Sequence, residues 1–413
     1  MSFREFEYAD GKSFKFWKID LQETNVVTKY GRIGSEGQES TKSFATAAEA
    51  QKAYDKLVAE KTTKGYVEKG SAAASGSAEV AGATTTAAAG DEHLSPMLFS
   101  TTPSENFELM HNFIGQRIAD YRGKSLKGKS VVRVRVSYDE EGDDGEPDFN
   151  QRLQAFLESD SAAGTKGLVI GAYDLEGGSS EGQFVEMIAH HKDRLPQLKA
   201  LFLGDIVQEE AEISWIQQSD MSLILKSFPG LEMLRVRGAT GLDFSSAEHP
   251  QLRALGIESG GLPAEIVGKI CRGKFPQLEY LELWLGTPNY SGDCRVNDLQ
   301  PLLKGKLFPK LKYLGLRNAE IADDIAAVIV TSPIIDQLEV LDLSLGNLSD
   351  VGASALLQLA SKTNLTRLDL HHHYISKPMQ KKLKQLPFPV DLSDAKTVDE
   401  DNEWSGRFIA ISE

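Results

Sequence analysis

Cysteine is almost absent from this sequence, which contains only Cys271 and Cys294 among 413 residues. Two cysteines cannot supply the disulfide framework that stabilises small secreted domains, so the composition fits a reducing compartment. No run of about 18 apolar residues occurs, so no segment is predicted to span a membrane. The opening segment, MSFREFEYADGKSF, also lacks an apolar core of signal-peptide length. We therefore expect a cytoplasmic protein that does not interact with a membrane.

The chain also has no excess of basic residues. The chain holds 45 Lys and Arg against 60 Asp and Glu, for a net charge of −15. Residues 1–70 hold 12 basic and 11 acidic residues and so carry +1, and the remaining 33 basic and 49 acidic residues carry −16. An acidic surface repels phosphates, so residues 71–413 are not expected to bind nucleic acid non-specifically.

Catalytic motifs are missing as well. Gly178-Ser179-Ser180-Glu181-Gly182 has the G-x-S-x-G pattern, but a nucleophile elbow needs its serine directly after a strand, and residues 174–177 intervene. Residues 139–146 form an acidic run that fails the spacing of a calcium-binding EF-hand loop. We therefore assign no catalytic residue, no cofactor and no metal ligand, and expect a protein that is not an enzyme.

A leucine pattern dominates the rest of the chain. Between residues 338 and 370 one L-x-x-L-x-L strand signature is followed by a second one 27 residues later (365 − 338). Between the two signatures, Val351, Ala355, Leu356 and Leu359 recur at helical spacing. The signature occurs at Leu198–Leu201–Leu203, Leu231–Leu234–Val236, Leu252–Leu255–Ile257, Leu278–Leu281–Leu283, Leu311–Leu314–Leu316, Leu338–Leu341–Leu343 and Leu365–Leu368–Leu370.

These strand–helix units cannot bury their apolar faces alone, so they must stack on one another. The 27-residue steps and the segment LSDVGASALL resemble the ribonuclease-inhibitor class of leucine-rich repeat. We predict an α/β leucine-rich-repeat solenoid with a parallel sheet inside and helices outside. In it, Leu281, Leu314, Leu341 and Leu368 should form one buried column.

The chain divides into five predicted segments. Residues 71–95, SAAASGSAEVAGATTTAAAGDEHLS, are an Ala/Ser/Thr/Gly tract that cannot bury enough apolar surface to offset the entropy of ordering, so they are predicted to be a flexible linker. The full division is a small α+β domain at 1–70, the linker at 71–95, a cap with a degenerate repeat at 96–197, leucine-rich repeats at 198–375, and a second cap at 376–413.

The first segment carries a specific family resemblance. Residues 29–34 read Lys-Tyr-Gly-Arg-Ile-Gly, and Gly37, Phe44 and a helix capped by Thr46 and Glu49 follow. This arrangement resembles a WGR domain, a family found in DNA-dependent poly(ADP-ribose) polymerases and in many bacterial proteins. The resemblance implies nucleic-acid binding by Tyr30 and Arg32, with Tyr30 where the family usually has Trp. Alternatively, these two residues brace the domain.

From about residue 131 onward, the chain also resembles a bacterial family of leucine-rich-repeat proteins of uncharacterised function. The segments LFLGD, LELWLG, LGLRNAEIADD, LDLSLG and LDLHHH carry this resemblance. It implies the repeat fold and a bacterial, cytoplasmic setting, and it implies no activity.

The candidate partner-binding residues lie between the leucines, because alternate strand side chains point to the concave face. Tyr, Trp and Arg are the residue types that anchor protein interfaces, and Trp284 is expected to be exposed there. The partner-binding residues predicted in this way are Arg235, Arg237, Tyr280, Glu282, Trp284, Tyr313, Arg317, Asp342, Asp369 and His371.

Two functions follow from this face. The favoured one is a non-enzymatic adaptor or scaffold that binds a protein partner on the concave face, with a WGR-like domain that contacts nucleic acid. The alternative is a metal-dependent hydrolase, in which Glu282, Asp342, Asp369 and His371 hold a divalent ion, since carboxylates and imidazole are common ligands. The sequence names no specific partner.

Overall fold

The structure of this chain is a computed structural model, and it divides into two compact units, Met1–Ala89 and Gly90–Glu413. The residues it describes are 3–9, 14–32, 38–43, 46–47, 50–52, 54, 58, 67–68, 109–136, 148–173, 183–208, 210–361, 364–398 and 406–412. The predicted linker at 71–95, the acidic run at 139–146 and the G-x-S-x-G segment at 178–182 lie outside these residues.

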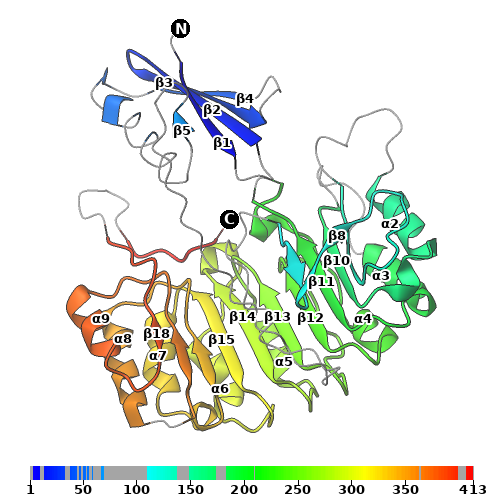
Figure 1. Cartoon of the computed structure of the whole chain (residues 1–413). Coiled ribbons are helices and arrows are strands. Elements are labelled where there is room, and N and C mark those ends of the chain that lie inside the picture. The colour runs from blue at the N-terminus through cyan, green and yellow to red at the C-terminus, as the bar shows by residue number, and fades with distance from the viewer. Residues whose placement is uncertain are drawn as a thin grey trace. The chain divides into compact units, whose positions relative to one another are not determined.

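The first unit contains an antiparallel sheet with the strand order β4-β3-β2-β1-β5 (Figure 1). Its strands are β1 (Arg4–Ala9), β2 (Phe14–Gln22), β3 (Asn25–Arg32), β4 (Gln38–Ser43) and β5 (Val67–Glu68). The sequence predicted β2, β3 and β4. It missed β1 and β5, which an ion pair joins, since Arg4 Nε lies 2.7 Å from Glu68 Oε1.

The predicted helix after Thr46 is present at the positions described there. Ala50 donates its backbone N–H to the carbonyl of Thr46 over 3.1 Å. Ala50 is fully buried beside Phe6 and Trp17, and Tyr54 and Val58 pack against the same cluster. Ala50, Tyr54 and Val58 therefore attach this helix to one face of the small sheet.

The second unit is built on a parallel sheet in which the described residues supply 11 strands, ordered β18 to β8 without a crossover. Each strand pairs in parallel with the strand before and after it in the sequence. The strands are β8 (Ala119–Asp120), β9 (Val131–Val134), β10 (Gly167–Gly171), β11 (Ala200–Asp205), β12 (Met233–Arg237), β13 (Ala254–Glu258), β14 (Tyr280–Gly286), β15 (Tyr313–Ala319), β16 (Val340–Asp342), β17 (Arg367–Asp369) and β18 (Val390–Asp391). A small hairpin, β6 (Asn112–Phe113) and β7 (Gln116–Arg117), precedes them.

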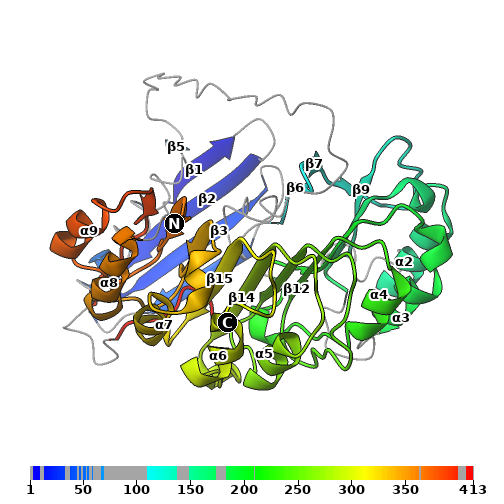
Figure 2. The ribbon, with the colours of Figure 1, turned by 90° about the horizontal axis from the view of Figure 1, so that it is seen from below.

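Helices connect these strands and lie together on one face of the sheet (Figure 2). Side chains cap some of them: Asp148 accepts from Gln151 N over 2.8 Å at the start of α2, and Ser349 accepts from Val351 N over 3.2 Å at the start of α8. The helices are α2 (Phe149–Glu158), α3 (Gln183–His190), α4 (Ser222–Ser227), α5 (Ala264–Cys271), α6 (Val296–Leu303), α7 (Ala322–Ile329), α8 (Asp350–Leu356) and α9 (Lys377–Leu383).

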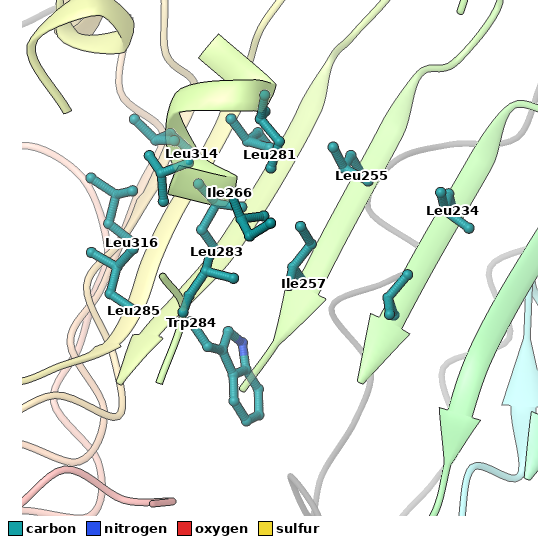
Figure 3. Close-up of a cluster of buried hydrophobic side chains, with 14 of the residues drawn as sticks. Leu234, Leu255, Ile257, Ile266, Leu281, Leu283, Trp284, Leu285, Leu314 and Leu316 are labelled. Carbon is teal, nitrogen blue, oxygen red and sulfur yellow. The ribbon is translucent and has the colours of Figure 1, made fainter. Parts of the chain in front are cut away.

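The leucines form the core between the sheet and the helices (Figure 3). Leu281 pairs with Leu314, Leu314 with Leu341, and Leu341 with Leu368, so the predicted column is confirmed. All four side chains are fully buried. One helical position was assigned wrongly: Val351 is 72% exposed, because it lies in the first turn of α8 and faces outward.

The last described segment, residues 406–412, runs along the carboxyl ends of the strands rather than covering the end of the sheet. Figure 1 shows it in red above the strands. Its backbone contacts Leu345 through Ala410, Asn318 through Ile411, and Ser214 through Ser412. Among the described residues, no helix is long and apolar enough to cross a membrane.

Candidate functional site

The candidate site is the face of the second sheet that points away from the described helices, which we call the helix-free face. Strand alternation places every predicted partner-binding side chain of β12 to β17 on it, opposite the leucines. Figure 3 shows the Trp284 indole directed away from Leu281 and Leu283 of the same strand, although Trp284 belongs to the same buried cluster as these leucines. The sequence therefore predicted correctly which residues share this face.

The prediction that Trp284 is exposed is wrong. Its side chain is 1% exposed, and nine of the ten predicted residues are buried, all except His371. Part of the cover comes from Met110, Phe113, Ile114 and Ile118, which join one buried cluster with the first residues of successive strands. The alternation of side chains along a strand decides which face each side chain occupies. Whether that face is exposed to solvent depends on other segments that pack on it.

The N-terminal half of the face contains a buried ion cluster. Glu258 is fully buried and lies between Arg235 and Arg237, each 1% exposed. Arg237 Nε donates to Glu258 Oε2 over 2.6 Å, and Arg235 pairs with the same carboxylate. Both guanidinium groups also lie over the ring of Phe202, with distances of 5.3 and 5.6 Å to its centroid. These arginines therefore have partners within the chain.

Glu282 is the centre of the middle part of the face. It accepts hydrogen bonds from the Trp284 indole over 2.7 Å, from Arg317 Nη1 over 2.9 Å, and from the Tyr280 hydroxyl. Burial alone would raise its pKa, but the positive charges of Arg317 and Arg235 hold the pKa below its ordinary value. Glu282 is therefore a stably ionised, fully paired carboxylate, which is unsuited to general acid or base catalysis.

Tyr280 and Tyr313 connect this centre to the next strand. Their rings stack with centroids 3.9 Å apart and an angle of 7° between the planes. The Tyr313 hydroxyl donates to Asp342 Oδ2 over 2.6 Å. Desolvation raises the pKa of both phenols well above the ordinary value. Both tyrosines are therefore neutral hydrogen-bond donors, and their stacked rings connect Glu282 on β14 to Asp342 on β16.

The C-terminal part of the face holds Asp342 and Asp369, which pair across β16 and β17 as predicted. Burial and the charge of Asp369 raise the pKa of Asp342. The pKa of Asp369 is lowered, because contacts with His371, whose Nδ1 lies 2.7 Å away, outweigh the effect of burial. Arg367 Nη2 also donates to Asp369 Oδ2 over 2.7 Å, so this carboxylate has a cationic partner on its own strand.

The predicted metal ligands do not converge. In the described part of the chain, no group of three or more His, Cys, Asp or Glu is arranged to hold a metal ion. The three consecutive histidines have different partners: His371 contacts Asp369, His372 Nδ1 lies 3.3 Å from Asp394, and His373 Nε2 lies 3.2 Å from the Leu392 carbonyl. The geometry gives the metal-dependent hydrolase no support.

An open pocket of about 670 Å³ lies beside the C-terminal end of the face. The sequence did not predict it, because it forms where the short strand β18 ends the sheet. The Arg367 side chain at its rim is 46% exposed and lies 2.7 Å from Asp369 and 3.4 Å from Asp391. The pocket is lined by Arg367, Lys384, Pro389, Val390, Asp391, Leu392 and Ser393.

Other predicted sites fall outside the described residues in part. Tyr30 and Arg32 belong to β3 and pair in the backbone with Trp17 and Lys15, but their side chains lie outside the described part of the structure. Cys271 and Cys294 are 7% and 4% exposed. Burial raises the pKa of Cys271 to about 11 and that of Cys294 to about 12, so neither thiol is an activated nucleophile.

Comparison with known proteins assigns the first unit. Residues 3–73 match the model of the WGR domain. The chain is 47% identical over 66 residues to Protein YehF of Escherichia coli K12, and 42% identical over 65 residues to the uncharacterised protein YfeS of the same strain. These matches cover 16% of this chain, and 24% and 27% of the two relatives. The chain thus spans about a quarter of the length of the curated relatives it matches.

A solved structure extends the comparison to the whole chain. A Bacteroides fragilis protein, whose crystal structure was determined by a structural genomics consortium, is 30% identical with a TM-score of 0.63. This match covers 100% of both chains. The chain is thus a protein with an N-terminal WGR domain followed by a parallel α/β region. It belongs to the same family as this Bacteroides protein.

Proposed function

We propose that this chain is a non-enzymatic adaptor, in which a leucine-rich-repeat solenoid at 198–375 binds a protein partner and the WGR domain contacts nucleic acid. The repeat assignment is supported by the sequential parallel strands and by the leucine column from Leu281 to Leu368. Each strand–helix unit buries its leucines against its neighbours, as stacked repeats do.

The observation that carries the adaptor proposal is the complete pairing of Glu282. Three donors, from Tyr280, Trp284 and Arg317, satisfy this buried carboxylate. A catalytic carboxylate needs an accessible lone pair or proton, whereas a paired one makes the sheet rigid. A rigid face loses little entropy when a partner docks, which favours recognition.

We place the partner at the accessible C-terminal end of the helix-free face. The side chains of His371 and Arg367 are 22% and 46% exposed there, and Asp391 is 34% exposed. The open pocket between Arg367 and Lys384 adjoins them. In this proposal Tyr280, Trp284 and Tyr313 hold the shape of the face from within, while Asp369 and His371 lie next to the partner.

The WGR domain contributes a second, weaker contact. Residues 1–70 carry a net charge of only +1, and phosphate affinity rests on several basic contacts. We propose that Tyr30 stacks on a base or sugar and that Arg32 pairs with a phosphate. Nucleic-acid binding by this domain should therefore be weak and sensitive to salt.

The test is affinity capture from extract of the source cells, with and without nuclease. The variants are Arg367→Glu with Lys384→Glu at the pocket, and a chain that lacks residues 1–70. Lys274→Glu is the matched control, because Lys274 is a 74% exposed lysine paired with Glu248 at another part of the sheet. We expect the pocket variant to lose the captured protein, and the control and the nuclease-treated sample to keep it.

Two results would count against this assignment. If the shortened chain loses the partner while the pocket variant keeps it, the WGR domain is the recognition module. If purified full-length chain turns over a substrate in a metal-dependent assay, the adaptor proposal fails.

A further inference from the structure

Three residues at equivalent positions in successive repeats have left-handed backbones although none is glycine. They are Asn318 (φ 50°), Leu345 (φ 65°) and His372 (φ 56°), and each follows the previous one by 27 residues (345 − 318 and 372 − 345). This conformation is unfavourable for a residue with a Cβ and persists only where the surroundings enforce it. Left-handed backbones at a repeated position indicate that the three residues make the same kind of contact.

All three residues contact one segment, Gly406–Ser412, which we call the strap. The Asn318 side chain accepts from Ile411 N over 3.1 Å and donates to the Ile411 carbonyl. The Leu345 carbonyl accepts from Ala410 N over 2.8 Å, and His372 Nε2 lies 3.3 Å from the Phe408 carbonyl. The three strained residues therefore form a track that holds the strap by its backbone.

The surroundings of the track are also shaped for an extended chain. A Cβ on Gly260 would lie 2.2 Å from the Ser412 carbonyl oxygen, so only glycine allows the strap to approach there. Ser214 Oγ donates to the same oxygen over 2.6 Å. Asn318 is fully buried, and within the described part of the chain its amide bonds to backbone atoms of the strap and of Ser259.

Two strap side chains add selectivity. Arg407 Nη1 donates to Asp323 Oδ2 over 2.7 Å and to the Asn347 carbonyl over 2.9 Å. Ile411 is 4% exposed, while Phe408 between them is 60% exposed. The strap thus offers one cation and one aliphatic anchor, four residues apart (411 − 407). The rest of the strap is recognised through its backbone.

We propose that this track is a peptide-binding site, and that the strap is an internal ligand which an extended Arg-x-x-x-Ile segment of a partner protein replaces. Backbone recognition by Asn318, Leu345 and His372 accepts many sequences, as strand addition does. Asp323 selects the arginine, and the buried hydrophobic cluster that Ile411 joins selects the aliphatic side chain. The site lies along the carboxyl ends of the strands, apart from the pocket at Arg367.

The test uses the full chain with Ile411→Asp, which loosens the strap, and a labelled peptide of residues 406–412. We expect the peptide to bind this variant saturably in fluorescence anisotropy, and the unaltered chain at least about tenfold more weakly, or about 1.4 kcal/mol. Adding Asn318→Ala should weaken binding to the variant by about tenfold or more. A control peptide with Glu and Asp at the Arg407 and Ile411 positions should not bind.

A chain ending at residue 405 gives an independent second host for the same peptide. Absence of binding to both hosts, with native circular dichroism in at least one, would overturn the proposal, as would equal binding to the unaltered chain. Light scattering tests whether the strap of a second copy of the chain, rather than a partner peptide, occupies the track. If the unaltered chain is a dimer that Ile411→Asp converts to a monomer, the track holds the strap of a second copy, and the partner peptide is excluded.

Discussion

Arg317 donates to Glu282 across β14 and β15, with Nη1 2.9 Å from Oε1, and the same guanidinium lies 5.3 Å from the centroid of the Trp284 ring. The Arg317 and Glu282 side chains are 9% and 2% exposed. Asp342 Oδ2 lies 3.4 Å from Arg317 Nε and shares the same positive charge. Arg317 of β15 thus contacts a carboxylate on each of the two strands that flank it, so its loss should destabilise the helix-free face.

Replacing Arg317 with Met should destabilise the second unit by about 3–5 kcal/mol, because Glu282 and Asp342 would lose their buried counter-charge. Equilibrium unfolding in urea measures this cost. Lys312→Met is the matched control: Lys312 lies at the entry to β15 and pairs with Glu339, but the two side chains are 57% and 49% exposed. Its loss should cost less than about 1 kcal/mol. If both variants lose the same unfolding free energy, the buried carboxylates do not depend on Arg317 for stability and the prediction is wrong.

Replacing Leu341 with Ala should cost about 2–5 kcal/mol, because a fully buried leucine is lost from the column and the neighbouring strands cannot close the cavity. The control is Val351→Ala, which also removes methyl groups but from a side chain that is 72% exposed. Thermal unfolding of both variants tests this. A small effect at Leu341 would contradict a continuous core.

The Asp323 carboxylate should make stability depend on acid pH. It accepts from Ser349 N over 2.8 Å, from Gly352 N over 3.0 Å and from Arg407. Burial alone would raise its pKa, but these donors, led by Arg407, hold the pKa below the ordinary 3.8. A depressed carboxyl pKa stabilises the fold above the unfolded-state pKa and loses this effect as pH falls through the folded-state pKa.

The difference in unfolding free energy between the unaltered chain and Asp323→Asn should therefore be largest near pH 7 and shrink below about pH 4. Urea unfolding at both pH values measures it. Arg407→Gln should reproduce part of the effect. A difference that grows as the pH falls would mean that the sign of the pKa shift is wrong.

The two cysteines should resist alkylation in the native chain. With pKa values raised to about 11 and about 12, almost no thiolate forms at pH 8. Mass spectrometry after iodoacetamide treatment should find Cys271 and Cys294 unmodified unless urea is present. Because these pKa values exceed the ordinary 9.0, stability is intact below about pH 9 and should fall as the pH rises further. Rapid native labelling would show that one thiol is activated.

Much of the fold can be predicted from leucine spacing. The signature at Leu338, Leu341 and Leu343 returns at Leu365, and a period-two strand can bury one face only in one register. The register of β14 to β17 and the pairing of Asp342 with Asp369 follow from this. In the first unit, Ala50, Tyr54 and Val58 lie at helical spacing, and these side chains pack in the same cluster as Phe6 and Trp17.

The sequence by itself determined which side chains share a face, because strand alternation and repeat length are local properties. Only the tertiary structure decided that Trp284 and Tyr280 are buried. Their partners Arg317 and Tyr313 come from the next strand, and residues 110–118 join the buried cluster that contains Tyr280. The tertiary structure likewise decided the contact of Asn318 with Ile411, which are 93 residues apart. Such contacts depend on how distant segments pack, and no periodicity along the chain encodes them.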